Sequence, residues 1–81
     1  MVNSNQDIIA REILKVVNES VEPLETKEIE VILKKKIKDV TRTKLFYRLM
    51  ILRGEGLLLG KFVGPGKGVW IWWKKSKEDK K

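Results

Sequence analysis

The chain changes its hydrophobic spacing near residue 57, and this change limits the folds that are open to it. Residues 57–63 and 69–73 are rich in aliphatic and aromatic side chains, and the segment between them reads Gly-Pro-Gly-Lys-Gly. Two such segments around a short glycine-rich turn are typical of a β-hairpin. Before residue 57 the apolar residues recur at helical spacing. The sequence therefore predicts an α+β fold in which a helical part precedes one hairpin.

The first two helices are predicted from their apolar stripes and their ends. One is expected between Asn5 and Asn18, with apolar residues at 9, 13, 16 and 17. It should end before Pro23, because the residue before a proline avoids the α region. The second is expected to follow Thr26 as its N-cap, with its stripe at 29, 32 and 33.

The third helix has the clearest signals. Asp39 or Thr41 is a suitable N-cap, and the helical spacing continues to about Arg53. Gly54 and Gly56 then act as stop signals. Together the patterns predict three helices followed by a two-stranded hairpin.

Length and composition restrict the domain organisation and the chemistry. At 81 residues the chain is expected to form one domain over residues 1–73, and residues 74–81, which lack any apolar side chain, are expected to form a disordered basic tail. It contains no Cys and no His, so we expect no disulfide, no metal site, no cofactor and no enzymatic activity. No apolar run approaches the roughly 18 residues of a membrane span, so we expect a soluble, cytoplasmic protein without membrane contact.

Charge is distributed unevenly along the chain. Residues 1–33 hold three basic and seven acidic side chains, whereas residues 34–81 hold fifteen basic and four acidic ones. The net charges of the two parts are −4 and +11, which gives the +7 of the whole chain. Nucleic acid is drawn to such a basic part because cationic side chains displace the counterions of the phosphates. A solvated, solubilising surface is the alternative interpretation.

Three segments give the chain a resemblance to the winged helix-turn-helix superfamily. Residues 23–29 (PLETKEI) resemble the loop and start of the second helix, residues 41–49 (TRTKLFYRL) resemble the recognition helix, and residues 52–58 (LRGEGLL) resemble the junction to the wing. The resemblance extends from about Ile8 to Trp73 and implies a transcription regulator that binds double-stranded DNA. The chain departs from the pattern in the turn, where Lys-Ile-Lys-Asp at 36–39 replaces the usual glycine, so a longer turn is expected.

A helical wheel divides the third helix into two sides. Leu45, Leu49 and Leu52 fall within a narrow arc that should face the core. The opposite side should be exposed; it consists of Thr43, Lys44, Tyr47, Met50 and Ile51.

The resemblance implies that the N-terminal part of this helix enters the major groove of DNA. Arg42, Thr43, Lys44 and Tyr47 are then the candidates for groove contacts, and Arg48 is a candidate for a phosphate contact. No acidic residue interrupts the sequence from Val40 to Arg53.

Further cations precede and follow that helix in the sequence. Lys67 at the tip of the hairpin and Lys61 on its first strand are candidates for contact with the minor groove or the phosphates. The run Lys34, Lys35 and Lys36 fits a phosphate contact and, equally, the favourable placement of cations at the C-terminal end of a helix.

Other functions remain open at this stage. Tyr47, Met50 and Ile51, or the first helix, could form a homodimer contact or the docking face of a protein adaptor. The wing aromatics Phe62, Trp70, Trp72 and Trp73 could instead stack on single-stranded DNA or RNA. Strand alternation places Trp70 and Trp72 on one face and Ile71 and Trp73 on the other. One of the two pairs is therefore expected to pack against the helices.

Overall fold

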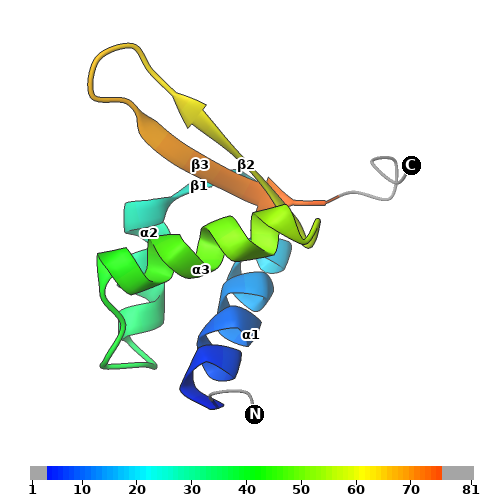
Figure 1. Ribbon diagram of the computed structural model, residues 1–81, viewed down its shortest axis with the longest axis vertical. Helices are drawn as coiled ribbons and strands as arrows, with labels where there is room; N and C mark the ends of the chain where they lie inside the picture. The colour runs from blue at the N-terminus through cyan, green and yellow to red at the C-terminus, as the bar shows by residue number, and fades with distance from the viewer. Residues whose placement is uncertain (1–3, 76–81) are drawn as a thin grey trace.

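The computed structural model describes residues 4–75, which form three helices and a three-stranded antiparallel sheet (Figure 1). In chain order the elements are α1 (Ser4–Glu19), β1 (Leu24–Glu25), α2 (Thr26–Lys34), α3 (Arg42–Gly54), β2 (Leu58–Val63) and β3 (Val69–Lys74). The hairpin of β2 and β3 lies over α3, and its tip extends towards the side where α3 begins (Figure 1). The expected α+β order of three helices followed by a hairpin is confirmed.

One hydrophobic core joins all three helices to the hairpin. Its members are at most 7% exposed, and most have no exposed area. They are Ile9, Ile13, Val17, Ile29, Leu33, Val40, Leu45, Leu49, Leu52, Leu58 and Trp72. Because a buried Val, Leu or Ile contributes about 1.5–3 kcal/mol, this cluster is the main source of stability in a chain without disulfides.

The start of α2 differs from the expectation. Thr26 is the first residue of the helix, and its N-cap is Glu25. The Glu25 backbone N–H donates a hydrogen bond to Glu28 Oε1 at 2.7 Å, as in a capping box. The Thr26 hydroxyl accepts a hydrogen bond from the indole N–H of Trp72 at 2.8 Å. A distant side chain therefore uses the hydroxyl that was expected to cap the helix.

The turn between α2 and α3 spans residues 35–41 and is longer than a tight helix-turn-helix turn, as expected. Its last residue, Thr41, caps α3 by accepting a hydrogen bond from the Lys44 backbone N–H at 3.2 Å. The cap is therefore Thr41 and not Asp39.

Gly56 ends α3 and redirects the chain into the hairpin. Its φ of +77° is in the left-handed region, which favours glycine. The N–H groups of Gly56 and Leu57 donate to the carbonyls of Arg53 and Leu52, both at 3.0 Å. This is a Schellman motif, and it satisfies carbonyls that the helix end would otherwise leave unpaired.

The sheet has one more strand than the sequence indicates. Its order is β1-β3-β2, so β3 lies in the middle and the two-residue β1 pairs with it. The expected two-stranded hairpin is confirmed, and β1 is an additional strand that the sequence did not predict, because two residues before a helix carry no alternation that could reveal a strand.

Alternation gives the hairpin two different faces. The inner face carries Trp72, which is fully buried, together with Trp70 stacked beside it. The outer face carries Ile71 and Trp73, which line a groove on the other side of the sheet. The expected separation of these two pairs is confirmed.

The C-terminal boundary is shifted slightly. Lys74, expected to begin the tail, is the last residue of β3. The rest of that prediction falls mainly on residues 76–81, which lie outside the described residues. Within residues 4–75, no helix has the length and apolar character needed to cross a membrane.

Candidate nucleic-acid interface

The first turns of α3 present a basic, exposed surface. Arg42, Thr43 and Lys44 are exposed, and Tyr47 retains 64% of its full exposed area. Arg48 is half-buried. The four exposed candidates are therefore all available to a partner at the N-terminal end of α3.

The other end of this helix is less exposed than the wheel predicts. Met50 packs against the core and Ile51 is half-buried, so the expectation that both are exposed is wrong. The buried arc is wider than the three leucines because Phe46, one turn before Met50, also packs against the core. Of the proposed apolar patch, Tyr47 is the member that remains largely exposed.

Glu30 on α2 links two of the candidate cations. Its side chain is nearly buried, and its Oε1 accepts a hydrogen bond from Arg42 Nε at 2.6 Å. Lys34 Nζ lies 3.2 Å from its Oε2. The hydrogen bonds from Arg42 and then Lys34 lower the pKa of Glu30 below its usual 4.5, although burial acts in the opposite direction. Glu30 is therefore a carboxylate, and it offsets part of the positive charge at the start of α3.

The three lysines at the C-terminal end of α2 differ in their contacts. Lys36 Nζ lies 3.2 Å from Glu12 Oε1 and connects the turn to α1. Lys34 is paired with Glu30, whereas Lys35 is exposed and forms no ion pair with the side chains described, those of residues 8–75. Sequence reasoning missed both carboxylates. Glu12 is far from Lys36 in the chain, whereas Glu30 lies four residues before Lys34, a helical spacing that could have revealed this pair.

Aromatic side chains join α3 to the hairpin. The Trp70 and Trp72 rings stack with centroids 5.2 Å apart, and Phe46 of α3 meets both rings edge-on at 5.9 and 6.0 Å. Phe62 of β2 also contacts Trp70, at 6.2 Å, and the Arg53 guanidinium lies 5.4 Å from the Trp70 ring centre. Such contacts each stabilise by about 0.5–1.5 kcal/mol beyond area burial. These rings serve the packing of the hairpin on α3.

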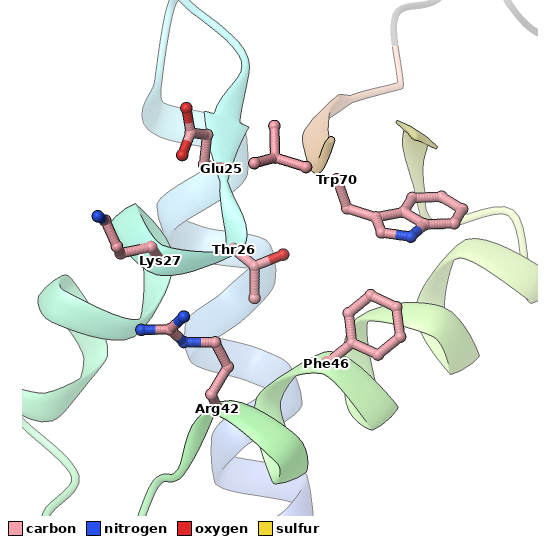
Figure 2. Close-up of a pocket in the computed structure, with 7 residues that line it drawn as sticks. Glu25, Thr26, Lys27, Arg42, Phe46 and Trp70 are labelled. Carbon is pink, nitrogen blue, oxygen red and sulfur yellow. The ribbon is translucent and has the colours of Figure 1, made fainter. Parts of the chain in front are cut away.

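A groove of about 440 Å³ opens where the start of α2, the start of α3 and β3 meet (Figure 2). Phe46 and Trp70 form its aromatic side, while Arg42 and Lys27 border the opposite side. Glu25, Thr26 and Val69 complete the lining. Among residues 4–75, no three acidic, Cys or His side chains gather in a way that could hold a metal ion.

Comparison with known proteins identifies the fold. No protein-family model matches the chain, and no curated protein matches its sequence. The structure superimposes on that of a PadR-like transcription factor from Bacteroides fragilis with a TM-score of 0.76 and 20% sequence identity, over 91% of this chain and 72% of the other. The chain has the winged-helix fold. This confirms the resemblance drawn from the sequence, at the level of the fold.

In the winged-helix fold, α3 stands at the position known as the recognition helix, and the β2–β3 hairpin stands at the position of the wing. Lys67 is exposed at the wing tip between Gly66 and Gly68, whose φ values of +71° and +50° shape the narrow turn. Lys61 lies at the middle of the wing, where it lines the outer groove with Ile71 and Trp73.

The predicted cations thus lie in separate places on the winged helix. Arg42, Thr43, Lys44 and Tyr47 share the surface of the recognition helix. Lys61 faces away from the helices, on the outer side of the wing.

Proposed function

We propose that this chain binds double-stranded DNA as a transcription regulator, with the recognition helix in the major groove and the wing tip on the backbone or in the minor groove. The observation that carries the proposal is that Arg42, Thr43, Lys44 and Tyr47 are all exposed at the N-terminal end of α3, where Glu30 of α2 offsets only part of the positive charge. The likeness in fold to a PadR-like transcription factor supports it.

The side chains on this surface suit the edges of base pairs and the phosphates. An arginine can donate two parallel hydrogen bonds to guanine O6 and N7, and a threonine can offer its hydroxyl or methyl group. Arg42 is bonded to Glu30 through Nε, which leaves its terminal nitrogens for a partner. Lys44 and the Tyr47 hydroxyl can reach phosphate oxygens or base edges.

The wing supplies contacts of another kind. Lys67 is carried by a glycine-rich tip that can approach a backbone closely. A lysine there neutralises a phosphate without reading sequence. Lys35 and Arg48 would add charge around the same duplex.

Two alternatives are less well supported. Stacking on single strands requires accessible rings on one face, whereas Trp72 is fully buried and Trp70 contacts Phe46, Phe62 and Trp72. The more accessible rings, Phe62 and Trp73, lie on opposite faces of the wing. A protein adaptor would not need the basic surface of α3. Both alternatives have distinct outcomes in a binding experiment.

The test is equilibrium binding to duplex DNA, single-stranded DNA and RNA of matched length across a salt series. The duplex should bind most tightly, with a slope of log affinity against log salt of roughly −4 to −6 for five or six neutralised phosphates. Tighter binding of a single strand would favour the stacking alternative, and salt-insensitive or absent binding would favour the adaptor.

Single-residue variants then distinguish a base contact of α3 from a phosphate contact of the wing. On a duplex selected from a random pool, Arg42→Ala should cost about 1–3 kcal/mol, with much less loss on random DNA. Lys67→Ala should weaken all duplexes equally and reduce the salt slope by about 1. Lys15→Ala, which removes an exposed lysine of α1, is the control and should change neither quantity. If Arg42→Ala and Lys67→Ala behave like the control, the assigned surface is wrong.

A further inference from the structure

The outer face of the three-stranded sheet carries an acidic, an apolar and a basic residue in one row. Ile71 of β3 is directly opposite Glu25 of β1 on one side and Lys61 of β2 on the other. Residues directly opposite in a ladder lie on the same face of a sheet. With strands about 4.8 Å apart, the backbones of Glu25 and Lys61 are separated by roughly 10 Å. No ion pair joins them within residues 4–75.

The rest of this face is largely apolar and has no covering element in the described part of the chain. The helices cover the opposite face of the sheet (Figure 1). In the next row Trp73 is opposite Leu59, and Trp73 and Ile71 line a groove of about 390 Å³ with Val21 and Pro23. Val21 is 94% exposed. Contiguous exposed apolar surface of this kind marks an interaction site more often than an ordinary surface.

We propose that this outer face binds a second copy of the chain, sheet against sheet, about a two-fold axis parallel to β3. Such a rotation places the β1 edge of one protomer over the β2 edge of its partner. Lys61 of each protomer then faces Glu25 of the other, and the two copies of Ile71 meet on the axis. The row is self-complementary because its charges have opposite signs at its two ends.

The charge pattern favours a second copy over other occupants. The charges along this face are balanced, with Lys61 and Lys74 against Glu22 and Glu25, so it lacks the excess of cations that draws a nucleic acid. In the two-fold arrangement both charge pairs are attractive, and aligned sheets pack at about 10 Å with interdigitating side chains. The face is small beside the roughly 800 Å² per partner of a standard interface, so we expect weak, concentration-dependent association.

Charge reversal tests this arrangement by sedimentation equilibrium of the full chain over a wide concentration range. Lys61→Glu makes the row acidic at both ends, and Glu25→Lys makes it basic at both ends. Each variant alone should raise the dimer dissociation constant at least about tenfold, because like charges then face each other twice. An equimolar mixture of the two variants should associate within about threefold of the wild type, because both facing pairs become attractive again.

The control is Lys15→Glu, which changes the net charge as Lys61→Glu does but lies on α1, and it should leave association unchanged. Circular dichroism checks that Glu25→Lys, at the N-cap of α2, retains its fold. The proposal is overturned if the wild type stays monomeric throughout, if Lys61→Glu associates like the control, or if the mixture associates no better than the separate variants.

A second measurement does not depend on charge. The chain has no cysteine, so Ile71→Cys introduces a single thiol at the position of the axis. Under mild oxidation it should form a disulfide-linked dimer several-fold faster than Val31→Cys, whose site is 56% exposed on α2. Equal rates for the two variants would overturn the proposal. Both readouts measure self-association without DNA, so they succeed or fail independently of the proposed DNA binding.

Discussion

Trp72 and Trp73 are neighbours in the sequence and lie on opposite faces of the same strand. Trp72 has no exposed area, bonds to Thr26 through its indole N–H and contacts Phe46. Trp73 is half-buried and lines an open groove. Alternation along β3 points the two side chains to opposite faces of the sheet, and the helices pack against only one of these faces. The role of an aromatic residue in this wing therefore depends on whether its position faces the helices.

The largest expected difference between the faces comes from truncating each tryptophan. Trp72→Ala should lower the free energy of unfolding by about 3–5 kcal/mol, because it leaves a cavity at the point where α2, α3 and the wing meet. Trp73→Ala should cost about 1–2 kcal/mol, since its ring is only partly removed from water. Urea unfolding of both variants measures the difference. Equal losses would contradict the distinction between the faces.

Gly60 of β2, which is directly opposite Trp72, gives a second test of how tightly the inner face is packed. A Cβ atom at Gly60 would overlap the ring of Trp72 at Cε3, within the inner face. Because that ring is enclosed by the core, Gly60→Ala should cost about 1–3 kcal/mol. Gly54→Ala is the matched control: no atom lies within 4 Å of its built Cβ, and alanine in a helix should stabilise by up to about 1 kcal/mol. Thermal unfolding of the two variants should shift in opposite directions.

The hydrogen bond between Trp72 and Thr26 should have a smaller effect. Thr26→Val keeps the shape of the side chain and removes the acceptor, so it should cost about 1 kcal/mol. Thr26→Ser keeps the hydroxyl and should lose less. A valine variant as stable as the wild type in urea would show that the indole N–H finds another acceptor.

A pH series separates this hydrogen bond, which joins β3 to α2, from the ion pair of Glu30 on α2 with Arg42 on α3. The pKa of Glu30 is lowered, so its charged form stabilises the fold above about pH 4.5, and this contribution is lost as the pH falls through the lowered value. The stability difference between wild type and Glu30→Gln should therefore be constant above about pH 5 and shrink below it. The difference for Thr26→Val should not change with pH, because neither partner titrates. Urea midpoints from neutral to acid pH measure both, and a Glu30→Gln difference that persists in acid would contradict the assignment.

Periodicity and end signals predicted most of the fold. The apolar stripes located the three helices, Thr41 proved to be the cap of α3, and glycine marked its end. The missed strand β1 has two residues and exists because β3 offers it partners. Local signals cannot reveal a strand whose hydrogen bonds are all made to a distant segment.

Less of the candidate site than of the fold could be predicted from the sequence. The exposed position of Thr43 and Lys44 followed from the wheel, but the carboxylate that holds Arg42 comes from another helix. The burial of Met50 depends on the packing around α3, and an isolated helical wheel has no term for a neighbouring element. Partners distant in the chain explain these misses.

The anchoring of Trp72 also has a thermodynamic consequence for association. Its hydrogen bond to Thr26 holds β3 to α2, and its contact with Phe46 fixes the wing against α3. In the proposed duplex complex, the conformational entropy of arranging these two elements has therefore been lost before DNA arrives. What remains to be ordered is confined to the glycine-rich tip and the long cationic side chains. The protein would meet the duplex as a preorganised surface, and less of its contact energy would be consumed in becoming rigid.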